Sequence, residues 1–147
     1  VDPAQRAVMT AAGLHERSAG LAVGAAGTLA MALAGLPAIG SVTTLLPNRS
    51  FHSVPVGFTW DDELGLARVI TFAPSRKARN LAEGGRASVC QVDGGRYLSL
   101  EGPAVVTSEP DRVAEGVRRY AERYRQPKER DDRVVIEISV EHIRGRY

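Results

Sequence analysis

The sequence predicts a mainly β domain, a small antiparallel barrel of six strands decorated by short helices. Three observations lead to this fold class. Apolar and β-branched runs of strand length recur between residues 39 and 140, hairpin-type turns join several of them, and only short segments have helical character. Because no linker or internal repeat divides the chain, we expect the strands to form one sheet around a single core.

Residues 1–27 are expected to form an N-terminal extension, and residues 28–147 the barrel domain. Gly20–Gly40 carries no charge and is nearly long enough to span a bilayer. It is mostly Ala and Gly, however, and Pro37 interrupts it. We therefore expect a packed or partly ordered N-terminal helix rather than a membrane span or a secretory signal, with Thr28–Gly35 as a candidate first helix of the domain.

Period-two alternation and β-branched residues define each strand in turn. A turn at Pro47–Ser50 separates the first two strands, and Asp61–Gly65 joins the second to the third in a hairpin. We expect the three acidic side chains of this hairpin turn to be in solvent rather than to bind calcium. Asp93-Gly94-Gly95 joins the fourth to the fifth, in which Gly102-Pro103 marks a bulge or bend. The strands are expected at Ile39–Leu46, His52–Trp60, Leu66–Phe72, Arg86–Val92, Arg96–Thr107 and Arg133–Val140.

Two helices lie between these strands. A short one is expected over Arg76–Gly84, ended by consecutive glycines. A longer one begins with Ser108 or Asp111 as its cap and runs to about Tyr124, with apolar side chains recurring at three and four so that one face packs. Its arginines 118, 119, 123 and 125 form a basic cluster, which we interpret as a solvated helix face; the alternative is an attraction for an anionic substrate.

The segment Val69–Leu81 is the strongest functional signal. A β-branched strand breaks at a proline and opens into a short basic helix, with three cations within four residues. Backbone N–H groups at a helix N-terminus and nearby cations suit a phosphate. The main candidates are Lys77 and Arg79, and the alternative is a solvated basic face.

Composition excludes several other functions. The net charge of +2 is spread over interleaved acids and bases, so a nucleic-acid partner is not expected. The single cysteine, Cys90, allows neither an intrachain disulfide nor a cysteine zinc site, and we expect it to be a core residue in a reducing cytoplasm. Three scattered histidines do not form a metal site, and no GxSxG, HExxH or Walker-type motif is present.

Four stretches carry a resemblance to a known family. They are Val-Pro-Val-Gly-Phe-Thr-Trp-Asp (54–61), Arg-Val-Ile-Thr (68–71), Ser-Arg-Lys-Ala-Arg-Asn-Leu (75–81) and Gln-Val-Asp-Gly-Gly-Arg-Tyr-Leu-Ser-Leu-Glu-Gly (91–102). In order and spacing they resemble the split-β-barrel, pyridoxamine-phosphate-oxidase-like superfamily of flavin and deazaflavin proteins. The likeness is greatest to actinobacterial enzymes that use coenzyme F-420, an 8-hydroxy-5-deazaflavin derivative. Their biliverdin-reductase-like members share Val-Gly-Phe-Thr, Leu-Ser-Leu-Glu-Gly and the Arg-Tyr-Ala-x-Arg-Tyr helix at 119–124.

The resemblance implies an FMN-binding-like split barrel that works as a homodimer, with the cofactor at the subunit interface. It also implies hydride transfer from reduced deazaflavin to a conjugated small-molecule acceptor, for which the protein orients a cofactor that does the chemistry. Strand residues flank the ring, a short helical segment surrounds the phosphate, and one tyrosine reaches the ring from the partner. The residues so assigned are Val56, Gly57, Val69, Ile70 and Thr71 for the ring, Ser75, Arg76, Lys77, Arg79 and Asn80 for the phosphate, and Tyr97 from the partner.

The chain departs from the pyridoxamine phosphate oxidases that bind FMN. Ser53 stands where those enzymes have an arginine, and the chain ends Glu-His-Ile-Arg-Gly-Arg-Tyr instead of in their pyridoxal-phosphate-binding tail. These differences argue against vitamin B6 oxidation and weaken the case for FMN. Two alternatives remain open: an FMN-binding oxidoreductase of the same fold, and a non-enzymatic protein that carries deazaflavin or a tetrapyrrole.

Overall fold

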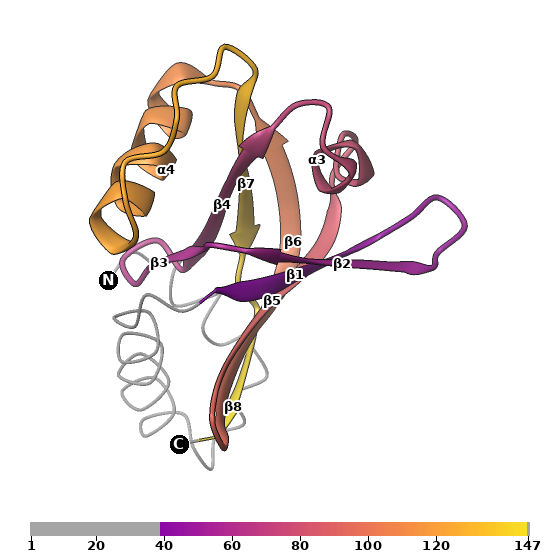
Figure 1. Cartoon of the computed structure of the whole chain (residues 1–147). Helices are drawn as coiled ribbons and strands as arrows, with labels where there is room; N and C mark the ends of the chain where they lie inside the picture. The colour runs from indigo at the N-terminus through magenta and orange to yellow at the C-terminus, as the bar shows by residue number, and fades with distance from the viewer. Residues whose placement is uncertain (1–38, 147) are drawn as a thin grey trace.

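The computed structural model describes residues 39–146, which form an antiparallel sheet of eight strands with two helices (Figure 1). The extension expected over residues 1–27 and the helix expected over 28–35 lie outside the described residues. The strand order is β2-β1-β5-β6-β7-β4-β3, and β8 pairs with β6. The predicted mainly β fold of split-barrel type is confirmed, although the described strands number eight rather than six.

The first half of the sheet comes from four short strands. They are β1 (Gly40–Leu45), β2 (Phe51–Val56), β3 (Thr59–Asp61) and β4 (Leu66–Phe72). The single strand expected over His52–Trp60 is wrong, because the chain stops pairing with β1 at Val56 and begins pairing with β4 at Thr59. Two edge strands of the sheet are therefore consecutive in the chain, and the sheet must curl so that its ends approach each other.

The second half is built on the long strand β6 (Arg96–Thr107). One edge of β6 pairs throughout with β5 (Gly85–Asp93), across the predicted turn at Gly94-Gly95. The other edge is shared by β7 (Arg133–Ser139) and β8 (His142–Arg146). β8 was not predicted, because its residues are mostly polar and exposed and show no alternation.

Gly102 lies where β6 changes partner from β8 to β7. The ladder with β5 continues through Gly102 and Pro103 without an extra residue, so the pair does not mark a bulge. A Cβ at Gly102 would lie 1.9 Å from the carbonyl oxygen of Ser139. Only glycine allows β7 to approach β6 this closely.

The two helices lie on different parts of the sheet. α3 (Arg76–Asn80) is a single turn beside β1, shorter than expected. α4 (Pro110–Arg123) packs on β3, β4 and β7, and Figure 1 shows it on the side away from the projecting β1–β2 hairpin. It begins at Pro110, and its N-cap is Glu109, which makes no side-chain capping bond, rather than the expected Ser108 or Asp111.

The core fills the inside of the curled sheet. Alternate residues of every long strand point inward, as period two requires, and Phe58, Leu81, Leu98, Leu100, Ile136 and Ile138 are among its largest fully buried side chains. Within the described residues no helix is long and apolar enough to span a membrane.

Candidate functional site

The junction between β4 and α3 is held by two buried hydroxyls. The Thr71 hydroxyl donates to Ser75 Oγ at 3.1 Å, and Ser75 Oγ accepts the backbone N–H of Ala78 at 3.3 Å. Ser75 is thus the N-cap of a five-residue helix. Its hydroxyl and one of the few free amides at this end already have partners, so an anion here depends on side-chain cations rather than on the helix terminus.

The cations of α3 point in two directions. Arg76 and Arg79 line a groove of about 560 Å³, bounded by the end of β1, the β1–β2 turn and residues 82–86. Lys77 does not line it and is instead half-buried, with its ammonium 5.9 Å from the centre of the Phe72 ring. Burial lowers the pKa of Lys77. An anion beside Lys77 would therefore also stabilise its charged form.

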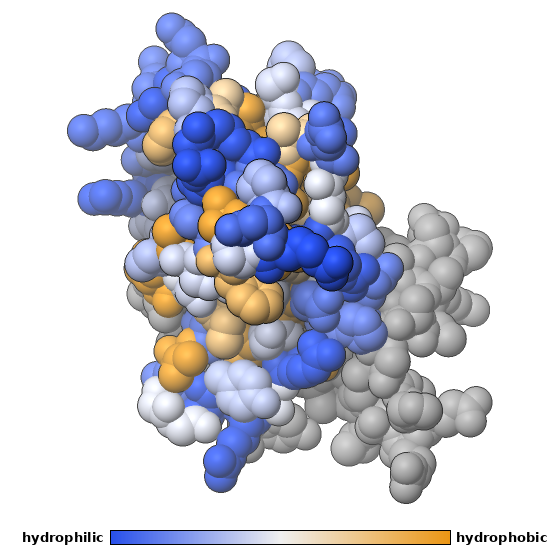
Figure 2. All heavy atoms as spheres, turned by 90° about the vertical axis from the view of Figure 1, so that its right-hand side faces the viewer, coloured by the Kyte–Doolittle hydropathy of each residue, from blue (hydrophilic) through white to orange (hydrophobic). Residues whose placement is uncertain are grey.

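The groove is strongly cationic. Arg49, from the β1–β2 turn, lines it together with Arg76 and Arg79, and none of the three forms an ion pair within the part of the chain that the structure describes. Arg86 also lines it but is bound to two carboxylates, and Glu83 is the only acid among the described residues of the lining. Figure 2, which faces this side, shows strongly hydrophilic side chains gathered beside α3 and the hairpin. Three guanidinium groups without a carboxylate partner among residues 39–146 fit a phosphate or carboxylate ligand.

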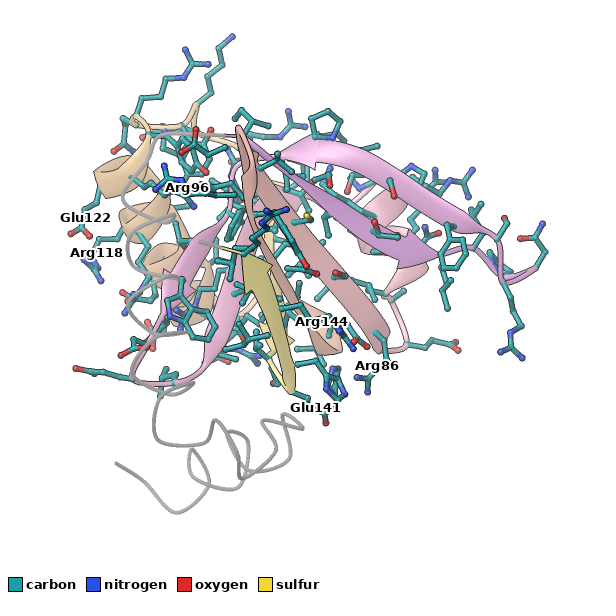
Figure 3. All side chains as sticks on the ribbon, turned by 90° about the horizontal axis from the view of Figure 1, so that it is seen from below. Arg86, Arg96, Arg118, Glu122, Glu141 and Arg144 are labelled. Atoms are coloured by element: carbon teal, nitrogen blue, oxygen red, sulfur yellow. The ribbon has the colours of Figure 1, made fainter. Side chains whose placement is uncertain are left out.

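The charge of Arg86 is neutralised by one carboxylate from β6 and one from the residue just before β8. It donates to Glu101 and to Glu141, each at 3.0 Å, and Arg144 approaches Glu101 at 3.4 Å. Figure 3 shows Arg86, Glu141 and Arg144 close together beside β8. This exposed network ties the start of β5 to the C-terminal end of the sheet, and it leaves the other three arginines of the groove to define its charge.

Asn80 connects α3 to the sheet. Its Nδ2 donates to Thr44 Oγ1 at 3.0 Å, and Thr44 is buried in β1. Val56 lies opposite Gly40, four residues further along β1 from Thr44. At about 3.3 Å per residue this separates the α3 end of β1 from Val56 by about 13 Å. An elongated ligand with an anionic group at one end spans such a distance.

The residues assigned to the cofactor ring do not all share a face. Val69 and Thr71 point into the barrel and are buried. Ile70 points to the other face, where its Cγ2 would lie 3.1 Å from a Cβ at Gly116 of α4. The side chain of Ile70 therefore lies on the opposite face of β4 from those of Val69 and Thr71, and only its backbone is available to the same site.

A comparison with protein-family models gives a match that includes all of the described residues. Residues 31–147 match the family described as pyridoxamine 5'-phosphate oxidase. The chain belongs to this family. A relative of this chain, the F420H(2)-dependent biliverdin reductase of Mycobacterium tuberculosis, is 49% identical over 104 residues, which are 71% of this chain and 76% of that protein.

Solved structures of the same fold agree with this assignment. A conserved hypothetical protein of Mycobacterium tuberculosis has a TM-score of 0.68 at 25% identity, covering 80% of this chain and 81% of its own. An F420 reductase has a TM-score of 0.63 at 21% identity, covering 78% of this chain and 94% of its own. The predicted membership of the pyridoxamine-phosphate-oxidase-like superfamily is confirmed.

Tyr97 lies far from the groove of this pyridoxamine 5'-phosphate oxidase family member. It pairs with Val92 on β5, whereas Gly85, which lines the groove beside α3, lies at the opposite end of that strand. Seven residues of strand correspond to about 23 Å. Tyr97 therefore cannot join the α3 cations within one protomer.

Sequence reasoning missed a cluster on α4 that contacts the residues between β2 and β3. Tyr124 and Arg123 bond to the backbone of Phe58, and the Tyr120 and Tyr124 rings pack against Gly57. The signal was present in the Arg-Tyr-Ala-x-Arg-Tyr stretch at 119–124, one of the stretches in which the sequence resembles biliverdin-reductase-like proteins. Helical spacing alone could not indicate what this face of α4 contacts.

Two predictions about charged residues are wrong. Asp61 is not in solvent but 2% exposed, with Arg68 at 2.8 Å and Arg119 at 3.0 Å. Burial alone would raise the pKa of Asp61, but hydrogen bonds from Arg68 and the Leu64 amide, together with Arg119, hold it below its usual value. The arginines of α4 are not all on a solvated face either. Arg118 is exposed beside Glu122 (Figure 3), whereas Arg119 and Arg123 turn toward the sheet.

The remaining reactive side chains offer no separate site. Cys90 is half-buried on β5 rather than in the core, and burial raises the pKa of its thiol, which disfavours a nucleophilic thiolate. No cluster of metal-ligating side chains is found among residues 39–146. The cationic groove and the neighbouring strand ends are therefore the candidate site.

Proposed function

We propose that this protein is a reductase that uses reduced coenzyme F-420 to transfer a hydride to a conjugated acceptor, with a biliverdin-like tetrapyrrole as the leading substrate. The 49% identity to a biliverdin reductase dependent on reduced F-420 supports the reaction and the cofactor. The structural observation that carries the proposal is the groove beside α3, where three arginines have no carboxylate partner among the described residues.

The groove residues bind the anionic part of the cofactor in this proposal. Arg76 and Arg79 donate to its phosphate, and Arg49 extends the same cationic surface toward an acidic tail. Lys77 supplies charge from the other side of α3, while Ser75 and Asn80 hold that helix turn in place. Ser75 is thus a supporting residue rather than a ligand, whereas Asn80 both supports the helix turn and lines the groove.

The strand ends orient the cofactor ring. In this proposal the ring is flanked by Val56 and Gly57 at the end of β2 and by the backbone of Val69, Ile70 and Thr71 in β4, since the side chains of Val69 and Thr71 are buried in the barrel. The bound deazaflavin supplies the hydride chemistry, and the protein supplies orientation and exclusion of water. Because the cofactor carries the reactive group, no catalytic triad is needed.

We further propose a homodimer that acts in the cytoplasm. Three exposed apolar side chains, Ile39, Val92 and Tyr97, lie at one end of β1, β5 and β6, and the first two line a shallow hollow of about 370 Å³ with Cys90. A second copy seated on this end would cover them and could bring Tyr97 to its partner's site, which one protomer cannot do. A reducing compartment suits a chain with a single cysteine.

The decisive experiment is a pair of fluorescence titrations of the purified protein, one with oxidised F-420 and one with FMN. Micromolar or tighter binding of F-420 alone, followed by loss of biliverdin absorbance with reduced F-420, is the expected result. Tight FMN binding would instead assign the protein to the flavin branch. Binding of F-420 without turnover of any conjugated acceptor would favour a carrier, and binding of neither cofactor would refute the proposal.

A further inference from the structure

Two of the sequence stretches that carry the family resemblance contact each other. The first is the segment between β2 and β3, which we call the Gly57–Phe58 corner. The second is the last turn of α4, which ends at Arg123 and is followed by Tyr124. They are 66 residues apart in the chain, yet Tyr124 reaches the backbone of Phe58.

The corner needs partners from outside the sheet. Gly57 and Phe58 belong to no strand, and Phe58 is fully buried. A buried backbone N–H or C=O without a partner is costly. Tyr124 provides both partners, because its oxygen accepts the N–H of Phe58 at 3.2 Å and lies 3.3 Å from the Phe58 carbonyl, to which the hydroxyl donates.

Arg123 fixes the same corner from a second direction. Its Nη1 donates to the Phe58 carbonyl, and its guanidinium lies 4.8 Å from the centre of the Phe58 ring. Its Nη2 donates to Oε1 of Gln91 at 2.6 Å, and Gln91 is fully buried in β5. The corner is therefore tied through Arg123 to the central part of the sheet.

The contact is also closely packed. A Cβ at Gly57 would lie 2.8 Å from the Tyr120 ring and 3.0 Å from the Tyr124 ring. The two rings contact each other with centres 4.9 Å apart. Real Cβ atoms do not approach other atoms this closely, so glycine is required for α4 to approach the corner.

We propose that Arg123 and Tyr124 are positioning residues, which hold the Gly57–Phe58 corner so that Val56 and Gly57 keep their place against the cofactor ring. This inference rests on the proposed function. Neither residue needs to contact the cofactor. Since the affinity for the cofactor comes mainly from its anionic groups in the groove, a displaced corner changes the position of the ring more than it changes the dissociation constant.

The test compares Tyr124→Phe and Arg123→Lys with the matched control Arg119→Lys. Tyr124→Phe keeps the ring against Gly57 and removes only the hydroxyl. Arg119 is also an inward-facing arginine of α4, but it pairs with Asp61 and not with the corner. The first readout is amide hydrogen exchange of Phe58 in the cofactor-free protein, and the second is the dissociation constant of oxidised F-420. The third is the separation of kcat from KM with reduced F-420.

We expect both corner variants to accelerate exchange of the Phe58 amide at least tenfold and to lower kcat at least tenfold. The dissociation constant of F-420 and the KM should stay within threefold of wild type. Arg119→Lys should lower stability while leaving kcat and Phe58 exchange unchanged. If it lowers kcat as much as Tyr124→Phe does, the effect is general loosening of α4 and the inference is wrong.

The outcomes separate this inference from the function on which it rests. If wild type binds F-420 and turns over while Tyr124→Phe and Arg123→Lys match it in kcat, only the positioning role is overturned. If wild type binds no F-420, the proposed function fails and the positioning role fails with it, whatever the exchange of the Phe58 amide shows.

Discussion

Replacing both groove arginines of α3 tests where the anionic part of the cofactor lies. Arg76 and Arg79 are exposed, and neither forms an ion pair within the described residues. A charge-assisted hydrogen bond contributes about 1.5–3 kcal/mol. Solvent exposure reduces this to about 1 kcal/mol for each arginine. Arg76→Ala with Arg79→Ala should therefore weaken F-420 binding by about 2 kcal/mol, or roughly thirtyfold in Kd.

The assay is fluorescence titration of oxidised F-420 at low and high salt. Because the contacts are exposed, the difference between wild type and the double variant should shrink in about 1 M salt, where the Debye length is about 3 Å. Arg118→Ala is the matched control, since Arg118 is an exposed arginine held by Glu115 and Glu122 on α4. A double variant that binds F-420 within twofold of wild type, or no more weakly than the control does, would refute the placement of the anion in this groove.

Three further predictions concern the framework. Gly102→Ala should yield little folded protein, because the added Cβ would lie 1.9 Å from a backbone carbonyl oxygen. Gly95→Ala is the control: its Cβ would meet nothing within 4 Å, so expression and the thermal unfolding temperature should not change. Asp61→Ala leaves the buried guanidinium of β4 without its nearest partner and should cost about 3 kcal/mol in urea unfolding, against less than about 0.5 kcal/mol for Asp62→Ala at the exposed neighbour. Hydrogen bonds from Arg118 and Arg119 lower the pKa of Glu115 from 4.5 to about 2. The stability that Glu115 contributes should therefore be present above pH 4.5 and lost as the pH falls toward 2. If a Glu115→Gln variant loses as much free energy of unfolding as wild type over that pH range, this reasoning is contradicted.

Local patterns were enough to predict most of the sheet. The strand over Leu66–Phe72 and the strand over Arg96–Thr107 have the predicted bounds, because alternation and turn residues define both ends. The break after Val56 could not be predicted, since apolar alternation continues through Phe58 while the pairing partner changes. β8 was missed because it is held by pairing with β6 rather than by a buried face of its own.

The site shows the same division between local and distant information. Arg76 and Arg79 could be identified because three cations follow one strand directly in the sequence. Arg49 could not, because only the topology brings the β1–β2 turn to the same groove. The contacts of Arg123 with the Gly57–Phe58 corner are likewise set by how α4 packs on the sheet. Asp61 was assigned to solvent because a turn of acids usually is exposed, and its buried arginines come from β4 and α4.

The shared edge of β6 has a consequence for how the molecule can come apart. Among the strands that the structure describes, β8 pairs only with Tyr97–Glu101 of β6, whereas β7 is flanked by both β4 and β6. The C-terminal strand can therefore peel away while the rest of the sheet stays paired. Its departure would leave five residues of β6 as an open edge, and such an edge invites pairing with another chain. A protein shortened before His142 should keep its fold and yet self-associate. We therefore expect β8 to protect this edge of β6 from pairing with other chains.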